Sequence, residues 1–357
     1  MIRVGLVGFG MAGRVFHGPL LSSVEGLELA AVMERSSNKA AERYPGITVY
    51  RSLEAMLADK SLGLFVVATP NDTHYALAKE ILSAGKNVVV DKPMTLTSAE
   101  AAELIGLAKK HNVLLAPFHN RRWDSDFLTV QKLLREGVLG RLVALESRFD
   151  RWRPARLTER LWKEDVDSGG MLQDLGPHLV DQPLTLFGKP EGVSAEVLRE
   201  RDGAGPNDSF TIRLRYPGSL HHGLIVTVAS NLLSLKAGPR FRLRGTRGGY
   251  IKKGVDPQEA ALTKVTRIAD PAWGQEPSSA WGLLWVDIDG GSVSRPVPAV
   301  TGDYRLYYAG IRDALLGKAP APVTGVDGWR VARLLEWAVE SSEKRREVAC
   351  DWSQEPK

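Results

Sequence analysis

The sequence predicts an α/β protein, with a doubly wound parallel sheet first and an α+β domain with an open, largely antiparallel sheet second. Strand-like and helix-like segments alternate from residue 1 to about 120, which is typical of a parallel sheet wrapped by helices. After residue 120, runs with period-two alternation of apolar residues indicate antiparallel strands. A chain of 357 residues exceeds one ordinary core, so we expect domains at residues 1–120 and 121–357. The last helix is free to pack back on the first domain.

The first expected strand, residues 2–7, runs directly into a glycine-rich turn. Gly8 permits the tight turn, Gly10 lets the backbone approach a pyrophosphate, and Gly13 lets the following helix pack closely on the strand. The free N–H groups at the start of that helix attract phosphate. This strand–turn–helix context predicts a Rossmann domain that contacts its cofactor through Gly8, Phe9, Gly10, Met11, Ala12 and Gly13.

Four further expected strands complete much of the first sheet, and a last one closes it. Residues 62–68 are apolar throughout, as a central strand buried on both faces should be, and Pro70 cannot extend its ladder. Thr97 or Ser98 can cap the helix that follows the strand at residues 87–90, because short polar side chains accept from orphan N–H groups. The other strands are expected at residues 27–33, 47–50, 87–90 and 113–118, with a short helix at 53–58.

The second domain mixes helices with half-buried strands. In residues 210–216 and 241–244, apolar side chains alternate with Thr and Arg, which predicts a sheet with one apolar and one polar face. We interpret the arginine stripe as a solvated or subunit-facing surface, and we expect a homodimer or homotetramer through this sheet. The expected strands are 142–150, 193–201, 210–216, 224–229 and 241–244, a hairpin turns at 289–291, and helices cover 124–136, 171–187, 303–316 and 328–342.

Composition describes an ordinary soluble globular protein, with 43% hydrophobic and 25% charged residues. The apolar runs are strand-sized and no leader precedes the first strand, so we expect neither membrane association nor a signal peptide. The single cysteine excludes an internal disulfide and suits a cytoplasmic location. The net charge is +5, and the Lys and Arg residues are interleaved with Asp and Glu. The sequence therefore has no basic block of the kind that indicates a nucleic-acid partner.

The chemistry is expected where the parallel strands end, because ligands of doubly wound sheets bind at the carboxyl ends of the strands. A lysine directly after a strand and before a proline, as at Lys92, is held at a defined height above the sheet. Its ammonium can polarise a substrate oxygen. Besides the glycine turn, this edge carries Glu34, Arg35 and Ser36, then Thr69, Pro70, Asn71 and His74, then Asp91, Lys92 and Pro93.

A second constellation lies in the expected helix at residues 171–187. Asp174 and His178 are four residues apart, so they share one helix face. The spacing fits a catalytic pair, and it equally fits a surface hydrogen bond. No third ligand with metal-binding spacing is nearby, so we expect no metal.

Together these motifs resemble the glucose–fructose oxidoreductase/inositol dehydrogenase (Gfo/Idh/MocA) family over essentially the whole chain. The family usually has Glu-Lys-Pro where this chain has Asp91, Lys92 and Pro93, a change that keeps the lysine. Residues 118–127, 150–154 and 174–182 further resemble the NADP-dependent scyllo-inositol dehydrogenase branch. That likeness does not fix the substrate.

The resemblance implies an NAD(P)-dependent dehydrogenase that oxidises a ring hydroxyl of a cyclitol or sugar. Lys92 would contact the nicotinamide ribose and the substrate hydroxyl, His178 would act as general acid/base, and Asp174 would orient the polyol. Oxidation should then rise with pH through a titration near neutrality. The rest of the pocket is predicted at Asn120, Arg121, Trp152 and Tyr304, with Arg151 and Arg153 as equal alternatives.

Two other functions fit the same fold. One is an enzyme that uses its cofactor transiently, as NAD-dependent glycosidases do, and the other is a nucleotide-sensing regulator without catalysis. The presence of Lys92, Asp174 and His178 argues against the regulator, because a protein that only binds needs no proton-transfer group.

Two signals conflict over the cofactor. Glu34 at the end of the second strand favours NAD, because a carboxylate there binds the ribose diol and repels a 2′-phosphate. Arg35, Ser36 and Ser37 follow at once and favour NADP, because a guanidinium beside hydroxyls holds a phosphate. Sequence reasoning favours NADP and leaves NAD open.

Overall fold

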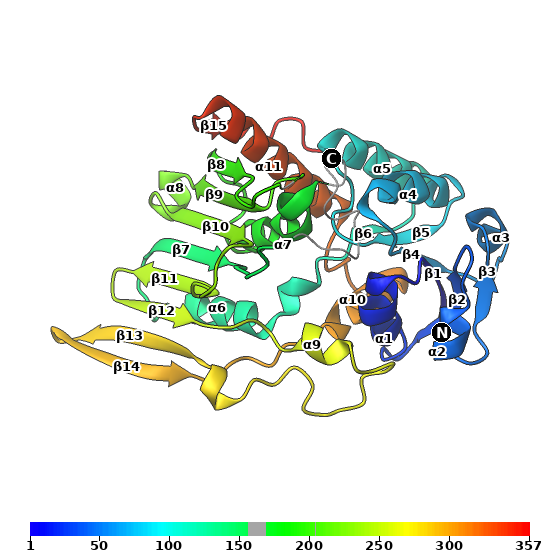
Figure 1. Ribbon diagram of the computed structural model, residues 1–357, viewed down its shortest axis with the longest axis horizontal. Coiled ribbons are helices and arrows are strands. Elements are labelled where there is room, and N and C mark those ends of the chain that lie inside the picture. Colours follow the sequence, from blue (N-terminus) through cyan, green and yellow to red (C-terminus); the bar gives the residue numbers. More distant parts are fainter. Residues whose placement is uncertain (156–168, 204) are drawn as a thin grey trace.

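The structure is a computed structural model that describes residues 1–155, 169–203 and 205–357. Two sheets, one of six strands and one of nine, form the centres of two domains that lie beside each other (Figure 1). Residues 1–119 form the first domain, and the final long helix returns to it from the second.

The first sheet is parallel throughout and has the strand order β3-β2-β1-β4-β5-β6, which is the predicted doubly wound arrangement. Its central strand β4 is buried along its whole length, which explains the unbroken apolar run in the sequence. The strands are β1 (Ile2–Val7), β2 (Leu27–Met33), β3 (Thr48–Tyr50), β4 (Leu64–Val67), β5 (Asn87–Val90) and β6 (Leu115–Pro117).

Helices connect these strands, and their ends follow the sequence signals. Helix α5 (Ser98–His111) starts at a capping box in which Thr97 and Glu100 satisfy each other's backbone N–H groups, so Thr97 is the cap of the two candidates that the sequence offered. After β1 the chain forms a wide turn of helix over Gly13–His17 before α1 (Gly18–Leu21). The other helices of this domain are α2 (Lys39–Arg43), α3 (Leu53–Leu57) and α4 (His74–Ser83).

The second sheet is mixed, with the order β14-β13-β12-β11-β7-β10-β9-β8-β15. All its pairs are antiparallel except β7 and β10, which run parallel because the intervening chain crosses over through helix α7 (Gly170–Phe187) and returns. The strands are β7 (Leu142–Arg148), β8 (Gly192–Leu198), β9 (Ser209–Arg215), β10 (Ile225–Asn231), β11 (Phe241–Gly245), β12 (Gly248–Lys252), β13 (Gly282–Ile288), β14 (Gly291–Val297) and β15 (Val348–Ala349).

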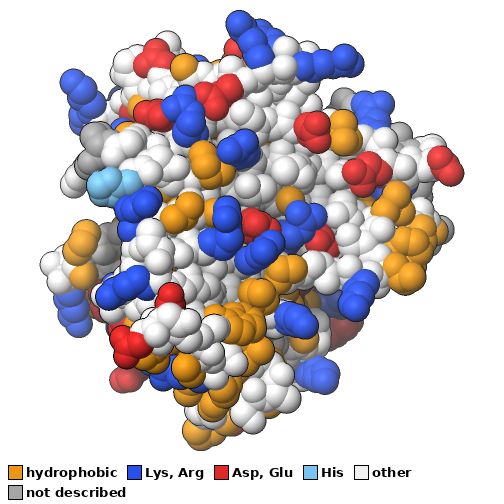
Figure 2. Space-filling view, turned by 90° about the vertical axis from the view of Figure 1, so that its left-hand side faces the viewer, with side chains coloured by type: hydrophobic (Ala, Val, Ile, Leu, Met, Phe, Trp, Pro, Cys, Tyr) orange, Lys and Arg blue, Asp and Glu red, His pale blue; other side chains and the backbone are white. Residues whose placement is uncertain are grey.

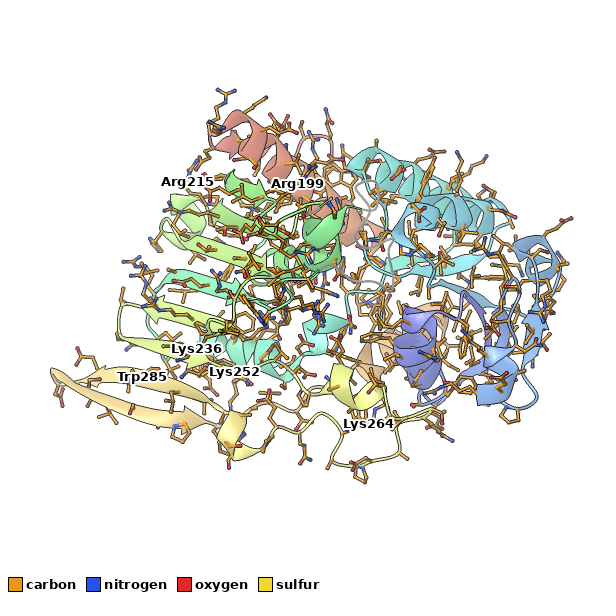
Figure 3. The ribbon with its side chains drawn as sticks, viewed as in Figure 1. Arg199, Arg215, Lys236, Lys252, Lys264 and Trp285 are labelled. Atoms are coloured by element: carbon orange, nitrogen blue, oxygen red, sulfur yellow. The ribbon has the colours of Figure 1, made fainter. Side chains whose placement is uncertain are left out.

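The predicted alternation of side chains in this sheet is confirmed. Ile212, Leu214 and Leu243 are buried in a core that α7 covers, whereas Arg213 and Arg242 are exposed on the other face. At the outer part of the sheet, Arg215 pairs with Glu191 and Glu347 at the surface (Figure 3). The remaining helices are α6 (Ser125–Arg135), α8 (Gly218–His221), α9 (Gln258–Leu262), α10 (Arg305–Leu315) and α11 (Gly325–Lys344).

Strands β13 and β14 form a hairpin that projects at the end of the second domain far from the first (Figure 1). Asp289 and Gly290 both have positive φ, 51° and 80°, which is the conformation that a two-residue hairpin turn requires. On this end of the molecule, Lys and Arg side chains are spread among acidic and apolar ones (Figure 2). Within the described ranges, no helix combines the length and apolar character that crossing a membrane requires.

Helix α11 fastens the two domains together. It starts at a second capping box, formed by Thr324 and Asp327, and its buried Trp329 packs in the core of the first domain. Near the middle of the helix, Glu336 accepts hydrogen bonds from the backbone N–H and the hydroxyl of Ser98, at 2.6 Å and 2.7 Å. The last helix therefore does pack back on the first domain.

We expect Glu336→Ala to lower the free energy of unfolding by about 1–3 kcal/mol, because it removes two hydrogen bonds to a charged, partly buried group. Urea denaturation measures this loss. Glu340→Ala on the same helix is the matched control, since Glu340 pairs with Lys344 at the surface and its loss should change stability by less than about 0.5 kcal/mol. Equal effects of the two substitutions would contradict a docking role for Glu336.

Candidate active site

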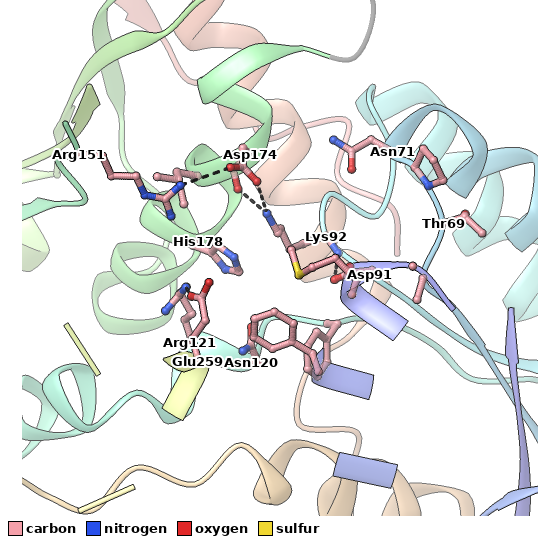
Figure 4. A pocket seen from close by; sticks show the side chains of 18 of the residues that line it. Thr69, Asn71, Asp91, Lys92, Asn120, Arg121, Arg151, Asp174, His178 and Glu259 are labelled. Atoms are coloured by element: carbon pink, nitrogen blue, oxygen red, sulfur yellow. Dashed lines mark hydrogen bonds and ion pairs between the residues drawn. The ribbon is translucent and has the colours of Figure 1, made fainter. Parts of the chain in front are cut away.

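A cavity of about 310 Å³ lies where the carboxyl edge of the first sheet meets helix α7 (Figure 4). The first domain contributes two of its three predicted strand-end loops and part of its glycine turn, whereas Glu34, Arg35 and Ser36 do not line the cavity. From the glycine turn and the loop after β4 come Gly10, Met11, Ala12, Thr69, Pro70 and Asn71. Asp91 and Lys92 line it from the same side, and Asp174 and His178 line it from α7. The structure thus brings together motifs that are more than 80 residues apart in the chain.

The glycine turn fits a dinucleotide. Gly8 has φ of +97°, and a Cβ there would lie 2.8 Å from the carbonyl oxygen of Ala68. A Cβ on Gly13 would lie 2.3 Å from the carbonyl oxygen of Gly8, so helix and strand can approach only because both residues are glycine. Gly10 faces open space, with nothing within 4 Å of its Cβ position, and this leaves room for a pyrophosphate beside the backbone.

Lys92 reaches across the cavity to the second domain. Its backbone N–H donates to Asp91 Oδ1 at 2.8 Å, which fixes the loop after β5. Its Nζ donates to the backbone oxygen of Asp174 at 2.5 Å and to Asp174 Oδ1 at 3.1 Å. The ammonium is therefore held at the cavity wall by two acceptors of one residue.

His178 lies one helical turn after Asp174 on the same face of α7 and is 6% exposed. Burial lowers the pKa of His178 well below its ordinary value, and the positive charges of Lys92 and Arg121 lower it further, against the opposing charge of Asp174. The imidazole is therefore neutral at neutral pH and ready to accept a proton. The titration near neutrality that the sequence predicts is thus displaced toward acid.

Arg121 lies on the opposite side of His178, where it pairs with Glu259 (Figure 4). Its guanidinium also lies 3.4 Å from Asp124 and stacks over the ring of Phe149, 4.8 Å from the centroid. Tyr304, which the sequence analysis placed in the pocket, is fully buried behind Arg121 and donates to Asp124 Oδ1 at 2.5 Å. Tyr304 therefore supports the wall of the cavity, whereas Asn120 and Arg121 line it.

Several other predicted residues lie near the cavity but do not line it. Phe9 packs edge-on against Tyr44 in the core of the first domain. The ring nitrogens of buried His74 lie 2.7 Å and 2.9 Å from the carbonyl oxygens of Pro93 and Thr69, so His74 ties two strand-end loops together. Trp152 is 49% exposed, because its backbone pairs with Leu233 and its side chain points away from the cavity.

The loop after β2 forms the adenosine end of the expected cofactor site. Glu34 is 6% exposed, and its carboxylate accepts from Ser37 Oγ at 2.5 Å and the Ala40 N–H at 2.8 Å. Arg35 and Ser36 are exposed. Arg51 donates to the backbone oxygens of Glu34 and Ser37 and so fixes the loop that follows β2.

The cavity also includes residues for which the sequence offers no signal. Glu259 comes from the short helix α9, between two strands of the second sheet, and no motif surrounds it. Phe16 has the character of an ordinary core residue in the sequence. Arg151 and Arg153, which were alternatives in the sequence analysis, both line the cavity.

The fold and this site define an oxidoreductase with an NAD-binding domain, and the chain belongs to the Gfo/Idh/MocA oxidoreductase family. The family model for the NAD-binding Rossmann fold matches residues 2–119, and the model for the C-terminal alpha/beta domain matches residues 131–350.

Two curated relatives match nearly the whole chain. The chain is 41% identical to the uncharacterized oxidoreductase YdgJ of Escherichia coli, over 98% of both chains. It is 35% identical to the scyllo-inositol 2-dehydrogenase (NADP(+)) IolW of Bacillus subtilis, over 97% of this chain and 95% of IolW. A solved oxidoreductase from Yersinia pestis superposes with a TM-score of 0.92 at 41% identity, covering 98% of this chain and 97% of that one.

We expect kcat/KM for alcohol oxidation to stay level through neutral pH and to fall only below the ordinary imidazole pKa of 6.5, because His178 is protonated only in acid. His178→Asn should lower turnover by about 10²–10⁴-fold and remove that acid limb. A pH–rate series with reduced-nicotinamide absorbance measures both.

His222→Asn provides the control for this series, because His222 is exposed and has φ of 51°, a conformation that Asn adopts readily. Its profile should match that of the wild type. An unchanged acid limb in His178→Asn would assign the titration to another group.

Proposed function

We propose that this protein is an NAD(P)-dependent dehydrogenase that oxidises a ring hydroxyl of a cyclitol or sugar, scyllo-inositol-like in shape, to the ketone or lactone, and runs reversibly. One observation carries the proposal: Lys92 from the cofactor domain meets Asp174 and His178 from α7 in a cavity that opens onto the glycine turn. The name of the relative IolW, scyllo-inositol 2-dehydrogenase, supports a cyclitol or sugar as the substrate class.

The residues divide the reaction between them. Lys92 Nζ carries three N–H donors, and with Asp174 occupying part of them it can still donate to a substrate hydroxyl and stabilise the developing alkoxide. His178 accepts the hydroxyl proton, or returns it during reduction. Asp174 fixes the lysine and offers an acceptor to the polyol. A bound nicotinamide supplies the hydride acceptor.

We further propose NADP as the preferred cofactor. Glu34 is the residue that would favour NAD, but its carboxylate is committed to Ser37 and to the N–H of Ala40 at the start of α2. The exposed Arg35 and Ser36 remain as polar groups that can contact the adenosine ribose, and a guanidinium suits a 2′-phosphate. The NADP(+) in the printed name of IolW agrees with this preference.

The activity is tested with a panel of inositols, aldoses and 1,5-anhydro sugars, offered with each cofactor and followed by absorbance of reduced nicotinamide. We expect reduction with at least one inositol or pyranose. Tight cofactor binding without turnover of any polyol or keto-polyol would instead favour a sensing role. Release of an aglycone from a glycoside without net cofactor reduction would favour the glycosidase-like route.

Within this assay, Lys92→Ala should lower kcat by about 10²-fold or more, because it removes the charged donor at the developing alkoxide. Lys92→Arg should not restore activity, since a guanidinium differs in shape and does not deprotonate. Lys79→Ala, which removes a lysine paired only at the surface, is the control. Near-normal turnover of the Lys92 variants would exclude Lys92 from the mechanism.

For the cofactor, we expect Arg35→Ala to raise the Kd for NADP by about tenfold and to leave the Kd for NAD within about twofold, because the guanidinium contacts only the additional phosphate. Calorimetric titration of both cofactors measures this. Arg3→Ala, which breaks a surface pair with Glu28, is the control. A wild type that prefers NAD, and whose preference Arg35→Ala does not change, would contradict the assignment.

A further inference from the structure

Residues 151–153 form an extended segment that places two arginines on the cavity. The backbone N–H groups of Arg151 and Arg153 donate to the carbonyl oxygens of Asn231 and Leu232, at 2.9 Å and 2.8 Å, and Trp152 bridges to Leu233. Because alternate side chains of an extended segment point the same way, Arg151 and Arg153 both face the cavity while Trp152 faces solvent. Both arginines also line a small adjoining hollow of about 40 Å³.

Arg201 holds the backbone of residues 151–155 in place. Arg201 Nη1 donates to the carbonyl oxygens of Arg153 and Ala155, at 3.4 Å and 3.2 Å, and Arg201 Nε pairs with Asp208 at 2.9 Å. The two cavity arginines are therefore presented on a fixed backbone, which lowers the entropy lost when they bind a ligand.

The acidic groups near these arginines are already committed to other partners. Asp150, directly before Arg151, accepts from Arg148 Nε at 2.8 Å and from Asn231 Nδ2 at 3.1 Å and is turned away from the cavity. Glu259 pairs with Arg121, and Asp208 pairs with Arg201.

The two guanidinium groups themselves have weaker partners. Arg151 Nη1 lies 3.9 Å from Asp174 Oδ2, whereas the Lys92 ammonium lies 3.1 Å from Oδ1 of the same carboxylate. Among residues 1–155, 169–203 and 205–357, no carboxylate lies within 4.0 Å of the Arg153 side-chain nitrogens. Among the described residues, the part of the cavity wall at Arg151 and Arg153 therefore carries more positive than negative charge.

Asp174 shows where the positive charge of Arg151 lies relative to Lys92 and His178. Figure 4 shows Asp174 between Lys92 on one side and Arg151 on the other, with His178 beneath them. A hydroxyl that reacts at Lys92 and His178 would belong to a ligand whose opposite side reaches Arg151 and Arg153. A planar guanidinium fork binds carboxylate and phosphate groups with two parallel hydrogen bonds.

We infer that the substrate is a monosaccharide-sized polyol that carries one anionic group, a carboxylate or a phosphate ester, bound by Arg151 and Arg153 across Asp174 from the reacting hydroxyl. This inference rests on the proposed dehydrogenase function and narrows its substrate class. With a neutral polyol, the only carboxylate of the described residues within 4.0 Å of either guanidinium group would be Asp174, at 3.9 Å from Arg151.

The test compares, at saturating cofactor, kcat/KM for D-glucuronate, D-glucose 6-phosphate and D-glucose, and for the corresponding acid and phosphate of an inositol beside the neutral ring. An anionic member of a set should exceed its neutral counterpart by about tenfold or more, because hydrogen bonds between two charged groups are the strong ones. The carboxylate and phosphate arms distinguish the two kinds of anion.

Arg153→Met and Arg151→Met should each lower the ratio of anionic to neutral kcat/KM by about tenfold, and Arg153→Lys should restore part of it. The ratio is measured within each protein, so a loss of folded protein cancels. Arg199→Met, which removes an exposed arginine of the same domain, should leave the ratio unchanged (Figure 3).

Equal kcat/KM for neutral and anionic members, or an unchanged ratio in both arginine variants, would overturn the inference and leave the dehydrogenase proposal standing. If no compound is oxidised, the dehydrogenase proposal fails, and calorimetric titration of the cofactor complex with glucuronate and glucose 6-phosphate decides the inference separately. Binding of either anion that Arg153→Met weakens about tenfold supports it, and the absence of binding overturns it.

Discussion

The contact between Lys92 and Asp174 is the interaction on which the candidate active site depends. Lys92 is fixed by the edge of the first sheet, whereas Asp174 belongs to helix α7 of the second domain, so the contact exists only when the two domains are correctly placed. Helix α11 supplies that placement, because it packs in the core of the first domain through Trp329 and reaches Ser98 through Glu336. A shift of α11 against the first domain would therefore move Asp174 and His178 relative to Lys92.

Buried charges behind the cavity hold its wall in place. Arg240 is enclosed between the rings of Phe149 and Phe241, 4.0 Å and 4.1 Å from their centroids, and lies 3.3 Å from Asp126. Its Nη2 donates to Gln182 at 2.9 Å, and Gln182 in turn donates to the backbone oxygen of Arg121. Removing one member of such a network strands its partner in a medium of low dielectric, which makes alternative arrangements of the wall costly. This network thus helps to hold Arg121 in place, and Arg121, after burial and Lys92, is one of the causes of the depressed pKa of His178.

At both ends of the cleft, the carboxylates are paired with other groups of the protein. At the proposed adenosine end, the carboxylate of Glu34 could have repelled a phosphate, but it serves as an internal acceptor for the loop that follows β2. At the proposed substrate end, the acids beside Arg151 and Arg153 pair with Arg148, Arg201 and Lys92. In both places the exposed charge that remains is positive, because the neighbouring carboxylates are consumed by groups of the protein itself.

The sequence alone determined the architecture and the central chemical groups. The glycine spacing, the apolar run of β4 and the period-two strands are local patterns, so the parallel sheet, the one-sided second sheet and the capping box at Thr97 were all predictable from them. Lys92, Asp174 and His178 were found because each stands in a recognisable motif, although only the packing of α7 against the first domain brought them within contact.

The tertiary structure decided what depends on partners distant in the chain. Tyr304 lies behind the cavity wall because its hydroxyl donates to Asp124. Trp152 faces outward because the alternation of side chains along residues 151–153 directs the two arginines toward the cavity. Glu259 lines the cavity although no sequence motif surrounds it. The orientation of Glu34 and the pKa of His178 belong to this second group, because both are set by neighbours that no local spacing specifies.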